Sequence, residues 1–184
     1  MPGTVDWCPP KGSPDPHASG RLRIATWNLG NLRSEDGEST FTGSDPSVKR
    51  FPTDYERIKC YVRLIDPDIL AVQEVDGNEA LARVVDSDIY DVHASNRPQG
   101  SLNGKQNTGF AFKRGLAVET KPDFEELNTS GRVRKGAQID LTHNAETIKL
   151  MSVHLRSGCF HNGSTSSACN TLMDQVPVLD PMSD

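Results

Sequence analysis

The period of the hydrophobic positions changes along the chain and predicts where helices and strands lie. Residues 21–28 alternate apolar and polar side chains and end in a Trp-Asn pair, which predicts a strand entering a core. Residues 53–65 carry apolar side chains at helical spacing, begin with a capping-box pair of Thr53 and Glu56, and are followed by Pro67, which cannot continue a helix. The first third of the domain is therefore predicted to be a strand followed by an amphipathic helix.

A nearly continuous apolar run, residues 69–72, follows the helix and ends on Gln73 and Glu74. Such runs are typical of strands that are buried on both faces. Further strands are predicted at residues 89–93, 109–113, 136–142 and 148–155, and helices at residues 79–85 and 171–179. Strands that first alternate with helices and then follow one another predict an α/β (α+β) domain built on a mixed sheet.

The remaining segments are polar and aperiodic. Residues 1–20 contain five prolines among glycines and serines and are predicted to be a disordered leader, so that the domain covers residues 21–184. Surface loops are expected at residues 34–49, 94–107 and 158–170. No internal repeat is found.

Composition narrows the function classes only slightly. Hydrophobic residues make up 35% of the chain and the formal net charge is -5, which weighs against indiscriminate attraction to nucleic acid or anionic membrane but is compatible with a local basic groove. No apolar run approaches the ~18 residues of a membrane helix, and the first twenty residues lack the apolar core of a secretory signal. We therefore expect a soluble chain without a transmembrane segment. The compartment is left open: the expectation is cytoplasmic for the chain as written, and secreted or periplasmic if an upstream signal was lost.

The four cysteines do not form the paired C-x-x-C spacing of a zinc site. Cys159 and Cys169 bracket a loop rich in glycine, serine and asparagine, so they form either a local disulfide, which requires an oxidising compartment, or two free thiols. The sequence leaves both alternatives open.

Polar side chains end three of the apolar runs. Asn28, Glu74 and His154 lie at or near the carboxyl ends of predicted strands, where open α/β sheets collect their ligand-binding groups. Each has a plain structural alternative: a turn former, a solvated acid and a satisfied histidine. Asn and Glu oxygens suit Mg²⁺, which usually takes one or two carboxylates with waters and substrate phosphate. Arg134, just before a strand, can offer a two-pronged donor to phosphate or be an exposed loop cation.

Five stretches carry a family resemblance. "LRIATWNLGNL", "DPDILAVQEVD", "NTGFAFKRG", "RKGAQIDL" and "MSVHLRSGC" resemble, in this order, the opening motifs of the endonuclease/exonuclease/phosphatase superfamily, over about residues 21–180. The superfamily includes pancreatic-type deoxyribonucleases, apurinic endonucleases, sphingomyelinases and inositol-phosphate phosphatases. The resemblance implies the mixed-sheet half of a four-layer, deoxyribonuclease-like α/β sandwich, with the catalytic cleft between its sheets.

The resemblance also implies roles for the candidate residues. Asn28 and Glu74 would hold the divalent metal, Mg²⁺ or Mn²⁺. His154 would match the first catalytic histidine of the deoxyribonuclease-like members, acting with Glu74. Arg134 would contact the substrate phosphate, together with Asn28.

Two departures from the family pattern stand out. Deoxyribonucleases use a glutamate to orient the first histidine, and the corresponding position here is Gln106, which cannot offset an imidazolium charge. The Asp-Asn pair and the terminal Asp-His dyad of the second half are absent from the sequence. The chain is therefore expected to be the N-terminal part of such a domain, incomplete at its C-terminus, with one face of its sheet uncovered.

The function expected from these patterns is that of a magnesium-dependent phosphoesterase that is inactive or weakly active as this truncated chain. The alternative is a non-catalytic module that binds phosphate-bearing ligands or pairs with a partner that completes the sandwich. The partner is expected to be a phosphate ester, either nucleic acid or a phospholipid headgroup. The sequence does not decide among DNA, RNA, lipid and inositol phosphate, and it leaves the oligomeric state open.

Overall fold

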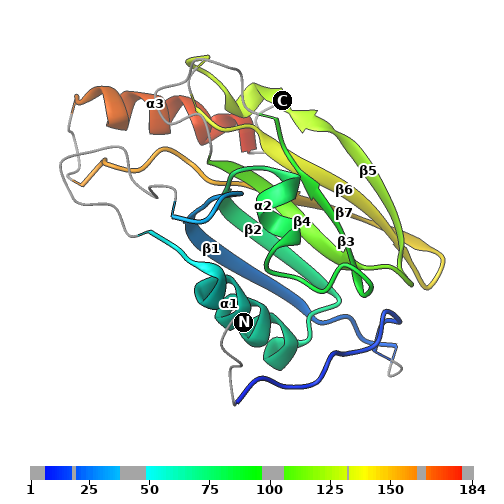
Figure 1. Ribbon diagram of the computed structural model, residues 1–184. Coiled ribbons are helices and arrows are strands. Elements are labelled where there is room, and N and C mark those ends of the chain that lie inside the picture. Colours follow the sequence, from blue (N-terminus) through cyan, green and yellow to red (C-terminus); the bar gives the residue numbers. More distant parts are fainter. Residues whose placement is uncertain are drawn as a thin grey trace.

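Two β-sheets packed face to face form the centre of the computed structural model (Figure 1), which describes residues 7–17, 20–37, 49–96, 106–131, 133–160 and 165–179. The first sheet is mixed and has the strand order β1-β2-β4-β3, in which only β1 and β2 are parallel. Its strands are β1 (Ile24–Leu32), β2 (Ile69–Val75), β3 (Tyr90–Ala94) and β4 (Asn107–Lys113). The mixed sheet expected from the sequence is confirmed.

A second, antiparallel sheet covers the inner face of the first. Its order is β5-β6-β7, and its strands are β5 (Ala117–Phe124), β6 (Gly136–His143) and β7 (Glu146–Ser152). Ile69, Phe110 and Phe112 of the first sheet and Ala137, Ile139 and Leu141 of the second form the core between them. The expectation of an uncovered sheet face was therefore wrong for this side, because the later strands build a second layer instead of extending the first.

Helices cover the outer face of the first sheet. Helix α1 (Pro52–Ile65) and the short α2 (Asn78–Ala82) pack on it through Tyr55, Val62 and Leu81. The predicted capping box is not the one that forms: the Asp54 carboxylate accepts the Phe51 amide N–H at 3.0 Å, two residues earlier than expected on each side. Asp66, with a φ of 46°, ends α1 in the left-handed region.

The last helix lies against the end of the second sheet. Helix α3 (Ser167–Gln175) begins four residues before the predicted start, because the Ser166 side chain accepts the Cys169 N–H at 3.2 Å and caps it. Short 3₁₀ turns occur at η1 (Glu125–Leu127) and η2 (Pro177–Leu179). The Gln175 side chain donates to the Leu127 carbonyl and ties α3 to η1.

Part of the predicted leader is packed against the domain. Residues 7–17 are joined to α1 by a disulfide between Cys8 and Cys60, and Lys11 Nζ lies 2.9 Å from the Asp88 carboxylate. Residues 1–6, 18–19 and 180–184, and most of two predicted loops (38–48 and 97–105), lie outside the described residues. A disordered leader therefore does not describe residues 7–17.

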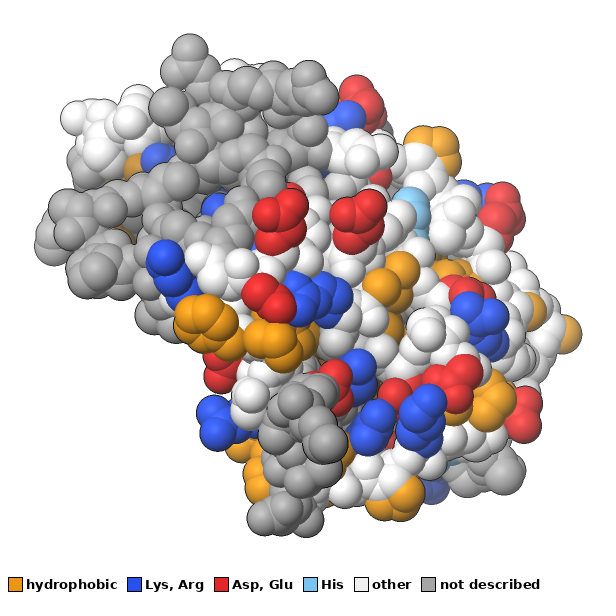
Figure 2. Space-filling view, in the orientation of Figure 1, with side chains coloured by type: hydrophobic (Ala, Val, Ile, Leu, Met, Phe, Trp, Pro, Cys, Tyr) orange, Lys and Arg blue, Asp and Glu red, His pale blue; other side chains and the backbone are white. Residues whose placement is uncertain are grey.

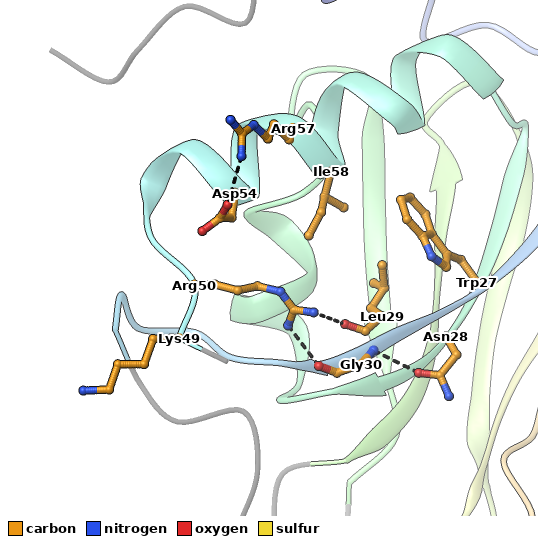
Figure 3. Close-up of a pocket in the computed structure, with 9 residues that line it drawn as sticks. All are labelled: Trp27, Asn28, Leu29, Gly30, Lys49, Arg50, Asp54, Arg57 and Ile58. Carbon is orange, nitrogen blue, oxygen red and sulfur yellow. Dashed lines mark hydrogen bonds and ion pairs between the residues drawn. The ribbon is translucent and has the colours of Figure 1, made fainter. Parts of the chain in front are cut away.

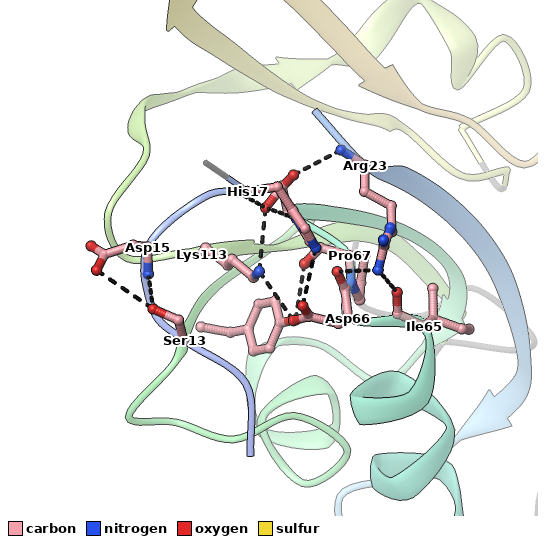
Figure 4. Close-up of polar contacts among 10 residues, drawn as sticks. Ser13, Asp15, His17, Arg23, Ile65, Asp66, Pro67 and Lys113 are labelled. Atoms are coloured by element: carbon pink, nitrogen blue, oxygen red, sulfur yellow. Dashed lines mark hydrogen bonds and ion pairs between the residues drawn. The ribbon is translucent and has the colours of Figure 1, made fainter. Parts of the chain in front are cut away.

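The end of this segment is held by a buried charge network (Figure 4). The His17 ring lies between two carboxylates, with Nδ1 2.8 Å from Asp68 and Nε2 3.1 Å from Asp66. Lys113 Nζ contacts the same two acids at 3.0 and 3.3 Å. Burial raises the pKa of Asp68, but hydrogen bonds from the Arg23 amide, His17 and Lys113 outweigh it and leave that pKa below its ordinary value.

All four cysteines are in disulfides. Cys159 and Cys169 are joined, which decides the alternative that the sequence left open, and the Cys8–Cys60 bond was not predicted. Within the described ranges, the structure contains no helix with the length and apolar character needed to cross a membrane. On the face shown in Figure 2, acidic and basic side chains lie beside one another without a broad patch of one sign.

Candidate functional site

The parallel pairing of β1 and β2 breaks at their carboxyl ends. The two strands keep a regular register up to the pair of Asn28 and Gln73, and the next pair is Leu32 with Val75. Three residues of β1 therefore oppose the single residue Glu74. This is a β-bulge, a feature that redirects side chains and is frequent beside active sites.

The bulge holds Glu74, which is not a glycine, in a strained backbone conformation. Glu74 has a φ of 60°, and Gly30 and Asn31 opposite it have φ values of 57° and 55°. A left-handed conformation outside glycine costs of order 1–2 kcal/mol and persists only where its surroundings fix it. Here the Asn31 N–H donates to Glu74 Oε2 at 3.1 Å and holds the carboxylate in place.

An arginine clamps the bulge from the α1 side (Figure 3). Arg50 donates to the carbonyls of Leu29 and Gly30 at 2.9 and 3.0 Å, and burial lowers its pKa. The Asn28 side-chain oxygen accepts the Gly30 N–H at 2.9 Å. These contacts satisfy the backbone groups that the irregular pairing leaves unpaired.

A cavity of about 510 Å³ opens between the bulge and the first turns of α1. It is lined by Trp27, Asn28, Leu29, Gly30, Lys49, Arg50, Asp54, Arg57 and Ile58. Figure 3 shows Trp27 and Ile58 as its apolar walls, with the Arg57 side chain turned toward Asp54 at its rim.

His154, which follows β7 of the second sheet, contacts Glu74 of the first sheet. It lies two residues beyond the end of β7, and its Nε2 is 3.6 Å from Glu74 Oε1. Burial lowers the pKa of His154, the nearby Arg134 charge lowers it further, and Glu74 opposes both. The lowered pKa favours the neutral imidazole, which keeps one ring N–H as a donor. Among the described residues, its buried Nδ1 has no hydrogen-bond partner.

Arg134 and Gln106 are in direct contact beside this pair. Arg134 is 9% exposed, and its Nη2 donates to Gln106 Oε1. The Gln106 Nε2 in turn donates to Asn31 Oδ1. Both ends of the Gln106 amide are thus used by Arg134 and Asn31. In this structure Gln106, expected from the family resemblance to lie where a glutamate orients the first histidine, contacts Arg134 instead of His154.

The four predicted residues lie around the carboxyl ends of β1 and β2, a region called the rim below. They do not all approach one another equally closely. Glu74 and His154 are in contact, Arg134 is close enough to shift the pKa of His154, and Asn28 is paired in register with the residue before Glu74. Sequence reasoning missed Asn31 and Arg50, which shape the bulge. The only signal for Asn31 was its place in the same "WNLGNL" motif as Asn28.

The donor set fits a magnesium-type ion held by few protein ligands. Glu74 Oε1 makes no hydrogen bond in the part of the chain that the structure describes, so it is available to a cation. In those same ranges, no cluster of three or more His, Cys, Asp or Glu side chains could hold a metal. One carboxylate and one amide oxygen, completed by waters and phosphate oxygens, are typical of Mg²⁺ and not of Zn²⁺.

Comparison of the sequence with protein-family models and with curated proteins finds no match. Similar solved structures are a truncated Caenorhabditis elegans TDP2 (TM-score 0.53, 18% identity, 75% of this chain and 47% of that one) and a second C. elegans TDP2 (0.52, 18%, 75% and 36%). A humanized D. rerio TDP2 with 14 mutations is also similar (0.51, 19%, 77% and 50%).

The chain spans half or less of each of these structures. TDP2, tyrosyl-DNA phosphodiesterase 2, has the fold of the endonuclease/exonuclease/phosphatase superfamily. The described residues therefore have part of that fold: a mixed sheet packed on an antiparallel sheet, consistent with half of a deoxyribonuclease-like sandwich.

Proposed function

We propose that the protein is a phosphodiesterase of the endonuclease/exonuclease/phosphatase superfamily that depends on Mg²⁺ or Mn²⁺. One observation carries the proposal: the carboxylate of Glu74, a residue held at a φ of 60°, lies at the strand ends 3.6 Å from His154 Nε2, which follows β7 of the opposite sheet. Backbone strain of this kind concentrates at functional sites, where the surrounding structure maintains it. The likeness to TDP2 supports the fold in which such a rim is expected.

In this proposal each residue of the rim has one task. Glu74 and Asn28 would hold the metal, which would supply charge to polarise the scissile phosphate. Arg134 donates its guanidinium N–H groups to a phosphate oxygen. The neutral His154 donates one hydrogen bond to another phosphate oxygen, and Asn31 keeps the carboxylate of Glu74 in its strained orientation.

These residues bind and orient a phosphodiester better than they cleave it. Hydrolysis also needs an activated water in line and a proton for the leaving group. Loss of one member of a catalytic unit commonly costs ~10³ to 10⁶ in rate. We therefore expect slow cleavage by this chain alone. The second candidate, a module that binds phosphate esters without cleaving them, is supported by the same set of donors.

The substrate to test first is DNA. The name of TDP2 specifies a DNA phosphodiester. Phosphodiesters of RNA and of phospholipid headgroups should be tested beside DNA for comparison. The rim itself offers donors to phosphate and no feature that distinguishes these sources.

Titration of Mn²⁺ followed by electron paramagnetic resonance tests the proposal. We expect one site in the wild type and an affinity at least tenfold lower in Glu74→Gln. Glu146→Gln, which removes an exposed carboxylate at the far end of β7, serves as the control and should bind normally. Equal Mn²⁺ affinity in Glu74→Gln would refute the ligand assignment.

Hydrolysis of bis(p-nitrophenyl) phosphate separates the two candidates. Mg²⁺-dependent cleavage that is lost in Glu74→Gln supports the enzyme. Metal and phosphate binding without cleavage above the buffer rate supports the binding module.

A further inference from the structure

A continuous series of hydrogen bonds joins the expected phosphate-binding residue, Arg134, to the expected metal-binding residue, Glu74. Arg134 donates to Gln106, Gln106 donates to the Asn31 side chain, and the Asn31 amide donates to Glu74. Gln106 is the centre of this series, since its two amide ends face the arginine on one side and the bulge on the other. It therefore couples the orientation of the guanidinium to that of the carboxylate.

The backbone around this contact is fixed on both sides. Thr108 Oγ1 donates to the Lys135 carbonyl and accepts the Ala137 N–H, both at 3.0 Å. Thr108 lies two residues after Gln106, and Lys135 directly follows Arg134. Two short segments from different sheets are thereby tied together next to the side-chain contact. Asn31, 2% exposed, is equally constrained within the bulge.

The chemical identity of Gln106 matters as much as its position. Its amide oxygen accepts the N–H of Arg134 without adding a negative charge. A glutamate at this position would place a carboxylate against the guanidinium and compete with any bound phosphate for it. The glutamine thus orients the arginine and, compared with a glutamate, leaves the local net charge more positive by one.

We propose that Gln106 is a positioning residue that aims Arg134 at the substrate phosphate and, being neutral, preserves the attraction of that site for an oxyanion. The inference rests on the proposed function and specifies how its phosphate subsite is built. It predicts that Gln106→Glu weakens phosphate binding, although the substitution keeps the length of the side chain.

The test uses inorganic phosphate without added metal, so that it reports on Arg134 and not on Glu74. The dissociation constant is measured by NMR from the backbone amides of residues 135–137 in the intact chain at pH 7. We expect Gln106→Glu to raise it roughly tenfold, as one added charge a few ångströms away does at intermediate dielectric. Gln106→Met, which keeps the length but neither bonds nor adds charge, should raise it by a smaller factor.

Thermal unfolding of the same variants excludes a merely structural role. Gln106→Glu creates an ion pair with Arg134 and should melt no lower than Gln106→Met, although it binds phosphate more weakly. If Gln106 only supported the fold, phosphate affinity and melting temperature would fall together. Gln138→Glu is the control for added charge, because Gln138 bonds the Pro122 carbonyl on the other face of β6. It should bind phosphate as the wild type does.

The outcomes distinguish this inference from the proposed function. Wild-type phosphate binding that Gln106→Glu leaves unchanged or strengthens overturns the role of Gln106 alone. Binding that Arg134→Met does not weaken overturns both the inference and the phosphate role of Arg134. The Mn²⁺ titration of Glu74→Gln tests the metal assignment independently, so neither phosphate result changes its interpretation.

Discussion

Replacing Glu74 with glycine should separate the backbone strain of the site from its metal affinity. The φ of 60° at this residue costs of order 1–2 kcal/mol for any side chain with a Cβ atom. Glycine avoids that strain but loses roughly 0.5–1 kcal/mol of chain entropy relative to alanine. Glu74→Gly should therefore be more stable than Glu74→Ala by about 1 kcal/mol. The lost hydrogen bond from Asn31 cancels in this comparison.

Added Mg²⁺ should stabilise the wild type but neither Glu74 variant. A ligand at ten times its dissociation constant stabilises the native state by about 1.4 kcal/mol, and it does so only where its site is intact. The wild type should gain this stability when Mg²⁺ is added, and both Glu74 variants should gain none. For a chain of this size, 1 kcal/mol corresponds to roughly 2–4 °C in melting temperature. Thermal and urea unfolding with and without Mg²⁺ measure both effects.

The turn between β6 and β7 offers a matched control. Ala145 has a φ of 65° and is exposed, so Ala145→Gly makes the same change from alanine to glycine away from the rim. It should raise stability by a similar amount and keep the full response to Mg²⁺. If Ala145→Gly is stabilised while Glu74→Gly and Glu74→Ala melt together, the bulge geometry is wrong. If Glu74→Gly responds to Mg²⁺ like the wild type, the metal has another ligand.

Contacts elsewhere in the structure allow further predictions. Replacing both Cys8 and Cys60 with serine should cost about 4 kcal/mol in urea unfolding, since the bond spans a sequence separation of 52, and a loss below 1 kcal/mol would contradict the cross-link. In metal-free protein, Arg134→Met should raise the pKa of His154 measured by NMR, because that charge adds to burial in lowering it; an unchanged pKa would rule out the proximity. Because the folded pKa of His154 is depressed, its contribution to stability is present above its ordinary value of about 6.5 and is lost as the pH falls. Lys113→Met should cost about 3 kcal/mol, since it removes a cation that is 1% exposed from between two carboxylates, and a neutral result would show that the network is solvated.

The strands that carry the site were predictable because their patterns are local. The apolar run of β2 identifies a buried strand and puts Glu74 at its end, whatever the rest of the chain does. β5 was missed because it is a polar edge strand that contains Pro122, a residue that weakens any strand prediction. The start of α3 depended on one capping serine within a loop-like composition.

The contacts that bring the candidate site residues together were not predictable, because they join distant segments of the chain. The bulge depends on the relative register of β1 and β2, which no single stretch encodes. The contact of Gln106 with Arg134 joins residues from different sheets. The Cys8–Cys60 bond links the N-terminal segment to a helix fifty residues later, without any local spacing signal.

The rim is rigid because hydrogen bonds, and not only apolar packing, join the two sheets there. Ser152 Oγ donates to the Val72 carbonyl at 2.9 Å, and Thr108 Oγ1 donates to the Lys135 carbonyl at 3.0 Å. These directional bonds weaken steeply when donor and acceptor move out of line. The carboxylate and the imidazole that meet across the sheets are therefore held at a fixed separation before any ligand arrives. Such preorganisation is what a site for a transferring phosphate requires, since a misplacement of about 1 Å can cost two orders of magnitude in rate.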